Sequence, residues 1–124
     1  MTYFFDTYAI VEIIKANPRY LSLKDESASC SIFNMAEVYY VLLTHEGKTA
    51  AENSLCVTQN YLAELSATVI QKAMDFRAEF NAKNRKTALS YADAIGYTYA
   101  LENGLEFVTG DEAFKGLKGV LFLK

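Results

Sequence analysis

The sequence predicts an α/β domain in which helices cover a mostly parallel sheet. Three observations support this prediction: short apolar or β-branched runs alternate with segments of helical periodicity, the chain has a single proline, and no repeat or low-complexity tract interrupts the alternation. With 124 residues, 52% of them hydrophobic, the chain is long enough for one sizeable core. We therefore expect a single domain over residues 1–124.

The sequence of the first two thirds of the chain predicts strands that alternate with helices, beginning with a strand. An aromatic run over 2–5 ends at Asp6, and apolar residues then recur at helical spacing up to Ile14. The further expected elements are a loop or short helix at 20–25, a strand at 28–33, helices at 34–45, 49–61 and 68–84, and room for a short strand at 62–67.

The last third gives the clearest pattern. A helix at 90–103 ends at Gly104, and a strand at 105–108 leads into the turn Thr109-Gly110-Asp111. A further strand is expected at 120–123. Because strands alternate with helices throughout, we expect helices on both faces of the sheet.

Acidic residues stand where the expected strands lead into helices or turns. We call them the junction acids: Asp6, Glu37, Asp93 and Asp111. In its helix, Asp93 lies within about 60° of Leu89 and Tyr97 and so shares their apolar side. A carboxylate in that position is costly unless another group pairs with it or binds it.

The junction acids predict a cation site, because the carboxyl ends of parallel strands meet at one edge of a sheet. Two like charges about 4 Å apart cost on the order of 4 kcal/mol at an effective dielectric constant of 20, and a divalent cation removes that repulsion. Oxygen ligands without His or Cys favour Mg²⁺ or Mn²⁺. Such a site is typical of phosphodiester hydrolysis.

Helix capping is the competing interpretation of each acid taken alone. Ser90 and Asp93 match a capping box, Asn34 and Glu37 match it as well, and Asp6 or Asp111 could be N-cap residues. Capping does not require Asp93 or Glu37 to lie on an apolar side, which both do. At this point both interpretations stay open.

Three stretches of the sequence resemble the PIN domain family, and more narrowly the VapC-type toxins of toxin–antitoxin pairs. FFDTYAI is similar to the family's opening strand, aspartate and hydroxyl residue, and SIFNMAEVYYVL to its second strand and glutamate-bearing helix. YADAIGYTYALENGLEFVTGDEAF resembles the family's most specific block, with its helix, strand and Thr-Gly-Asp turn. The resemblance covers essentially the whole chain.

This resemblance implies a three-layer α/β/α sandwich with about five parallel strands. The four junction acids, all present, match the family's metal-binding and catalytic positions, while Thr7 and Thr109 match its supporting hydroxyl residues. The implied activity is hydrolysis of RNA that depends on Mg²⁺ or Mn²⁺. The implied partners are an RNA substrate, a cognate antitoxin and a second copy in a homodimer.

RNA contacts must come from a local basic patch, because the net charge is −3. The best candidates are Lys83, Arg85 and Lys86, just before the helix of Asp93, and Lys115 and Lys118 are similarly placed past Asp111. Phosphate contacts of this kind specify no base sequence.

Two alternatives to a toxin nuclease stay open within the same family. One is a PIN-like module that binds proteins without nuclease activity, and the other is a PIN nuclease of RNA processing that is not a toxin. A haloacid-dehalogenase-like phosphatase is disfavoured, because it needs a second aspartate where Tyr8 stands.

The remaining residue types exclude other kinds of site. His45 is the only histidine, which excludes a His-rich metal site within one chain, and Cys30 and Cys56 form no CxxC pair. We see no membrane span and no basic N-terminal export signal, so we expect a cytoplasmic protein with buried free thiols.

Overall fold

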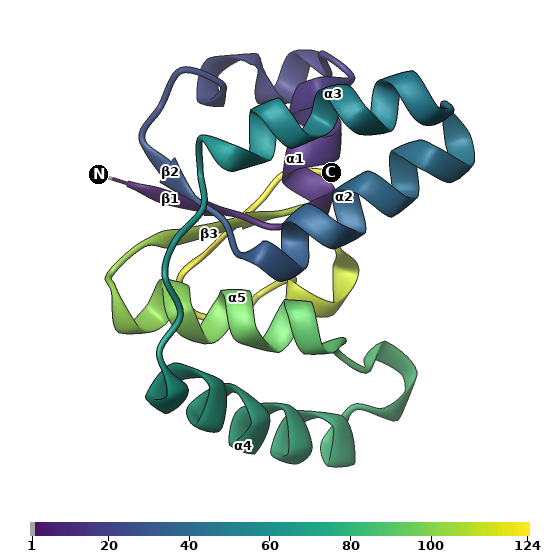
Figure 1. The fold of residues 1–124 in the computed structure, drawn as a ribbon. Coiled ribbons are helices and arrows are strands. Elements are labelled where there is room, and N and C mark those ends of the chain that lie inside the picture. The colour runs from purple at the N-terminus through teal and green to yellow at the C-terminus, as the bar shows by residue number, and fades with distance from the viewer. Residues whose placement is uncertain (1) are drawn as a thin grey trace.

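A four-stranded parallel sheet forms the centre of the computed structural model, which describes residues 2–124 (Figure 1). Its strands are β1 (Tyr3–Phe5), β2 (Ala28–Ser29), β3 (Glu106–Thr109) and β4 (Val120–Phe122), in the order β2-β1-β3-β4. Each pair of neighbouring strands is parallel. The predicted α/β class is confirmed.

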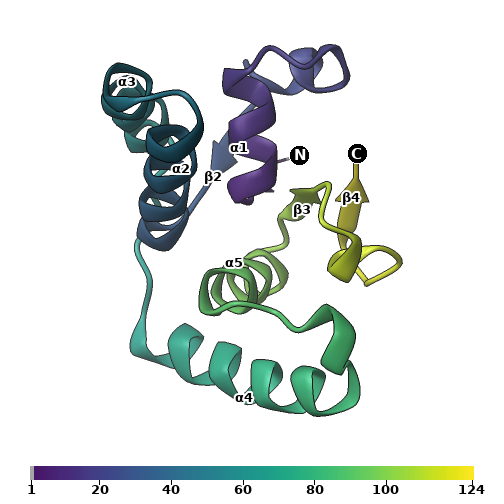
Figure 2. The same cartoon turned by 90° about the vertical axis from the view of Figure 1, so that its right-hand side faces the viewer.

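Helices cover both faces of the sheet and form a three-layer sandwich. The α-helices of residues 2–124 are α1 (Thr7–Ile14), α2 (Ile32–His45), α3 (Lys48–Gln59), α4 (Ala67–Lys83) and α5 (Tyr91–Glu102), and the 3-10 helices are Pro18–Leu23, Arg85–Thr87 and Glu112–Phe114. α1, α2 and α3 lie on one side of the sheet, and α5 lies on the other with α4 outside it (Figures 1 and 2).

Alternation along the strands explains why buried side chains lie on both faces of the sheet. Phe5 and Val108 face the side of α1, α2 and α3, whereas Phe4 and Phe107 face α5, and all four side chains are fully buried. Side chains on a strand point alternately to opposite faces. The short aromatic strand β1 therefore supplies buried side chains to both faces of the sheet.

Gly96 brings α5 close to the sheet. A Cβ atom at this position would lie 2.7 Å from Cε1 of the Phe4 ring. The missing side chain of Gly96 admits the Phe4 ring into the interface between α5 and β1. Its role is packing.

The second strand is shorter than predicted, and α2 begins earlier. β2 ends at Ser29, and Ser31 caps α2 in a capping box with Asn34. The expected pairing of Asn34 with Glu37 as a capping box is therefore wrong, because Asn34 is itself the N3 residue. Glu37 lies in the second turn of α2, not in its first.

The segment at 62–67 contributes only one bridge to the sheet. Cys30 pairs with Leu62 in a parallel bridge, and residues 63–66 form no strand. The expected count of about five strands thus corresponds to four strands and this bridge.

The helices of residues 2–124 are shorter than a membrane span requires. The longest, α4, has 17 residues. None of them combines the length and the apolar character that a membrane crossing needs.

Candidate active site

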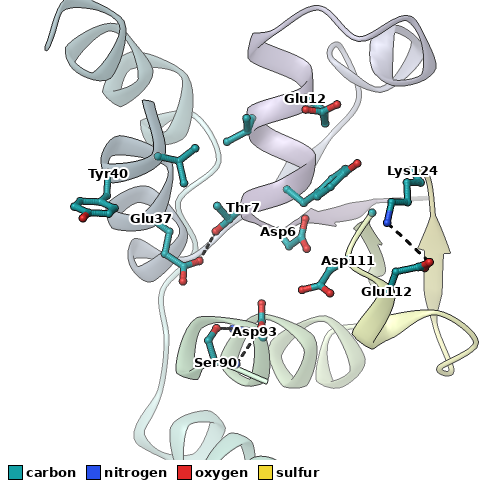
Figure 3. A pocket seen from close by; sticks show the side chains of 14 residues that line it. Asp6, Thr7, Glu12, Glu37, Tyr40, Ser90, Asp93, Asp111, Glu112 and Lys124 are labelled. Carbon is teal, nitrogen blue, oxygen red and sulfur yellow. Dashed lines mark hydrogen bonds and ion pairs between the residues drawn. The ribbon is translucent and has the colours of Figure 1, made fainter. Parts of the chain in front are cut away.

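A pocket lies where β1 and β3 end, between α1, α2 and the start of α5 (Figure 3). Its volume is about 780 Å³. It is lined by Asp6, Thr7, Tyr8, Val11, Glu12, Glu37, Tyr40, Val41, Ser90, Asp93, Gly110, Asp111, Glu112 and Lys124. All four junction acids therefore line one pocket, although 105 positions separate the first from the last in the chain (111 − 6).

Asp6 is the most deeply buried of the junction acids. It follows β1 and caps α1, and its Oδ1 accepts a hydrogen bond of 2.8 Å from the Ala9 N–H. Its exposed fraction is 3%. Burial raises the pKa of Asp6 to about 7, although hydrogen bonds from the Thr109 hydroxyl and the Ala9 N–H act in the opposite direction.

Asp93 combines the two roles that the sequence left open. Ser90 caps α5, the Asp93 N–H donates to Ser90 Oγ at 3.1 Å, and the Ser90 N–H donates to Asp93 Oδ2 at 3.0 Å. The predicted capping box is confirmed. Its carboxylate still points into the pocket (Figure 3), where burial raises its pKa and the two Ser90 hydrogen bonds lower it.

Asp111 enters the pocket from the turn after β3. Its N–H donates to Thr109 Oγ1 at 2.9 Å, and its Oδ1 accepts a bond of 3.0 Å from the Ala113 N–H. Thr109 is fully buried, and its hydroxyl also acts on Asp6. Thr109 thus contacts two of the four acids.

Glu37 reaches the pocket from α2 and is held by α1. The Thr7 hydroxyl donates a hydrogen bond of 2.5 Å to Glu37 Oε1 (Figure 3). Burial raises the pKa of Glu37, and the bond from Thr7 lowers it. Thr7 therefore supports the acid on a different helix, 30 residues away.

The junction acids act on one another electrostatically. The charges of Asp93 and Asp111 raise the pKa of Asp6, and the charge of Asp93 raises the pKa of Glu37. Glu12 and Glu112 add further acids to the lining, and Lys124 is its only cation. The pocket therefore has a strongly negative potential, which favours a cation.

The carboxylates do not form a ready-made ligand cage. Among residues 2–124, no group of three or more His, Cys, Asp or Glu side chains is arranged to hold a metal ion. Each junction acid instead accepts a hydrogen bond from a neighbouring hydroxyl or N–H group. Asp6, Asp93 and Asp111 nevertheless point toward a common space (Figure 3).

The predicted RNA-binding residues lie outside the pocket. Lys83 pairs with Glu79 at 3.2 Å near the end of α4, and Arg85 and Lys86 belong to the following 3-10 helix. None of the three lines the pocket. Their predicted role in RNA binding stays a prediction, as does that of Lys115 and Lys118.

Sequence reasoning missed several residues of the site, and Asn34 is the most informative. Its side chain is 2% exposed and donates a hydrogen bond to Thr7 Oγ1 at 3.1 Å. The spacing of Ser31 and Asn34 is itself a capping pattern and could have moved the helix start to Ile32. No local pattern could have indicated that Tyr8, Glu12, Tyr40 or Lys124 lines the pocket.

Comparison with known proteins identifies a family and a set of similar folds. The PIN domain family matches residues 3–120. No curated protein matches the sequence significantly. Solved structures of similar fold include a toxin–antitoxin complex from Klebsiella pneumoniae. Its matched chain is 19% identical to this one, the match covers 96% of this chain and 95% of the Klebsiella chain, and the TM-score is 0.71.

Two further structures are similar over most of the chain. VapBC2 from Rickettsia felis, bound to a DNA fragment of its promoter, has 20% identity, covers 99% of this chain and 98% of its own, and gives a TM-score of 0.72. VapC20 from Mycobacterium tuberculosis is a toxin that cleaves the sarcin-ricin loop. It has 15% identity, the match covers 88% of this chain and 87% of VapC20, and the TM-score is 0.69. At these identities the similarity establishes the fold.

Proposed function

This chain belongs to the PIN domain family, and from that membership and its acid-lined pocket we propose that it is a metal-dependent endoribonuclease. In this proposal, residues 1–124 form one nuclease domain and the junction acids are its catalytic residues. The observation that carries the proposal is the meeting of four acids from four separate segments at one edge of the sheet. Helix capping alone would not bring them into one pocket.

The donor set of the pocket fits Mg²⁺ or Mn²⁺. It offers carboxylate oxygens and hydroxyl groups and contains no His or Cys. Mg²⁺ keeps several waters and needs few direct protein ligands, so a complete cage of carboxylates is not required. The four junction acids would hold the cation: Asp6, Asp93 and Asp111 at the sheet edge, and Glu37 from the side of α2.

The bound cation would supply charge neutralisation at the phosphate and activation of a water. The chain's own groups prepare the site. Thr109 holds Asp6 and Asp111 together, and Ser90 fixes Asp93 at the start of α5. Asp6 must lose its proton before it can bind a cation, and its raised pKa places that loss near neutral pH.

We further propose that the chain is the toxin of a toxin–antitoxin pair. Two structures of similar fold support this proposal, since the Klebsiella structure is described as a toxin–antitoxin complex and VapC20 as a toxin. The pocket offers six acids against one lysine, beside the apolar side chains of Val11 and Val41. That combination would suit an antitoxin segment with basic and apolar side chains.

A homodimer is part of the same proposal. The outer face of α2 exposes several apolar side chains at helical spacing: Ile32, Ala36, Tyr40 and Leu43. Such a face on a short helix is a candidate interface between two copies. Size-exclusion chromatography with light scattering tests it, because Ile32→Glu combined with Leu43→Glu should convert a dimer into a monomer.

Two alternatives predict different results. A PIN-like module that only binds proteins would leave RNA intact, and an RNA-processing nuclease would cleave RNA without a partner that inhibits it. No feature of residues 2–124 favours the protein-binding module over the nuclease, because every family acid is present.

The test is cleavage of a panel of structured RNAs by purified protein with Mn²⁺ and with EDTA. We expect cleavage with Mn²⁺ only, and its loss in Asp6→Asn and Asp93→Asn while both variants stay folded. Asp75→Asn, an exposed acid on α4, is the matched control and should cleave normally. If wild-type protein leaves every RNA intact with Mn²⁺, the proposal is wrong.

A further inference from the structure

We propose that Asn34 is a positioning residue of the pocket, which fixes the direction of the Thr7 hydroxyl bond and thereby holds Glu37 ready for a divalent cation. This inference rests on the proposed function, because it assigns Glu37 to the cation. It concerns a buried amide that lies outside the junction acids and does not line the pocket.

The orientation of the Asn34 amide is fixed by Ser31. The Ser31 N–H donates to Asn34 Oδ1 at 3.0 Å, and the Ser31 hydroxyl donates to the same atom at 2.8 Å. A backbone N–H can only donate, so the atom that it meets must be the amide oxygen. The amide nitrogen of Asn34 therefore has to point the other way, toward Thr7.

The Asn34 amide then determines what the Thr7 hydroxyl can do. Asn34 Nδ2 donates to Thr7 Oγ1 at 3.1 Å, and an amide NH₂ group cannot accept. Thr7 Oγ1 is thus an acceptor toward Asn34, and its single proton is free for Glu37 Oε1, at 2.5 Å. The chain of donors runs in one direction, from Ser31 through Asn34 and Thr7 to Glu37.

The end of this chain of hydrogen bonds orients the Glu37 carboxylate. The bond engages Oε1, and within residues 2–124 no hydrogen bond to Oε2 is found. Oε2 is the oxygen that remains available to a cation.

Capping alone does not explain the contact between Asn34 and Thr7. The capping box of α2 is complete with the bonds between Ser31 and Asn34. The bond from Asn34 Nδ2 to Thr7 spans 27 residues and joins α2 to α1. This additional bond connects the start of α2 to the supporting hydroxyl of the site.

The test is the Mn²⁺ affinity of the full chain at pH 8, measured by isothermal titration calorimetry. Asn34→Ala should weaken Mn²⁺ binding by about 10-fold, the usual effect of losing a group that orients a metal ligand. Asn34→Asp keeps the shape and the acceptor for Ser31 but removes the donor to Thr7, so a similar loss is expected. It serves as the second variant if Asn34→Ala does not fold.

Ser31→Ala is the matched control for helix capping. It removes the capping hydroxyl but leaves the Ser31 N–H to orient Asn34, so it should lower the melting temperature and change Mn²⁺ affinity by less than about 2-fold. Thr7→Val should weaken binding as Asn34→Ala does, and the double variant should lose little more, because both changes break one chain of bonds.

Two results of the Mn²⁺ titrations overturn the inference. Normal Mn²⁺ binding by both Asn34 variants overturns it, and so does a loss in Ser31→Ala as large as that in Asn34→Ala. If wild-type protein cleaves RNA while the Asn34 variants bind Mn²⁺ normally, only this inference fails. If wild-type protein neither binds Mn²⁺ nor cleaves RNA, the proposed function fails and the inference fails with it.

Discussion

A Cβ atom on Gly110 would lie 2.2 Å from Cε1 of the Tyr8 ring. It would also lie 2.6 Å from the carbonyl oxygen of Leu123. Real Cβ atoms essentially never approach other atoms this closely, so Gly110 admits the Tyr8 ring against the turn that carries Asp111. This contact couples the segment after β1 to the segment after β3, the two places from which Asp6 and Asp111 enter the pocket.

Gly110→Ala should therefore damage both stability and the site. The Tyr8 ring can rotate away, but the backbone at Leu123 has to shift, and overpacking of this kind costs about 1–3 kcal/mol. Denaturant unfolding measures the stability, and Mn²⁺ titration measures the site. Gly96→Ala is the matched control, because its Cβ meets the Phe4 ring, away from the pocket. Loss of stability without loss of Mn²⁺ affinity is expected there, and an equal loss of affinity in both variants would contradict the prediction.

Asp6→Asn should stabilise the metal-free protein at high pH. The pKa of Asp6 in the folded state, about 7, lies above its unfolded value of 3.8, so the folded state binds the proton more tightly. Its contribution to stability is complete below pH 3.8 and is lost as the pH rises through 7. Asn is neutral at every pH and its amide oxygen can still cap α1.

The expected gain of Asp6→Asn at pH 8 is on the order of a few kcal/mol, since one pKa unit corresponds to about 1.4 kcal/mol. At pH 4 the gain should nearly vanish. Urea unfolding in EDTA at both pH values measures it, with Asp75→Asn as the control that should show no pH-dependent difference. A variant that is less stable than wild type at pH 8 would contradict the assigned burial of the charge.

Mn²⁺ affinity should increase between pH 6 and pH 7 and then level off. A cation binds the ionised form of Asp6, so below its pKa of about 7 the proton competes with the metal. If Asp6 releases one proton when Mn²⁺ binds, the Mn²⁺ affinity should fall about tenfold for each pH unit below that pKa. Calorimetry in buffers of different ionisation enthalpy counts the protons released. Affinity that is constant from pH 6 to pH 8 would show that Asp6 does not bind the cation.

The basic residues at the end of α4 and just after it should control the salt dependence of RNA binding. Lys83→Ala, Arg85→Ala and Lys86→Ala together should weaken binding of a single-stranded RNA to the Asp6→Asn protein. The slope of log affinity against log salt should fall by about 0.7 for each phosphate that these side chains no longer neutralise. Lys15→Ala combined with Lys24→Ala, which alters exposed lysines of another surface, is the control. An unchanged slope in the triple variant would place the RNA elsewhere.

The order of strands and helices was predictable because it depends on local periodicity. The helix at 91–102, its Ser90 cap and the strand at 106–109 follow from apolar spacing, a capping pattern and the glycine at 104. The start of α2 was not predicted correctly, because Ile32 and Phe33 have strand propensity. The Ser31 cap overrode that propensity, and Phe33 is 40% exposed on the helix instead of buried in a strand.

The acids were predictable as a set, but their supporting groups were not. Asp6, Asp93 and Asp111 stand at junctions that parallel topology brings to one edge, so the sequence pattern was sufficient for them. The contacts of Thr7 with Glu37 and of Tyr8 with Gly110 join segments that are far apart in the chain. Such contacts depend on how α1 and α2 pack, which no local pattern records.

The sequence by itself determined the class of fold, the four junction acids and the cap of α5, since each of these depends on periodicity, residue type or a spacing of a few residues. The tertiary structure decided that the acids form no ligand cage in the pocket they share, that Asp6 is buried enough to raise its pKa to about 7, and that Asn34 reaches Thr7. The physical reason is that burial and long-range hydrogen bonds arise only when helices and sheet pack together.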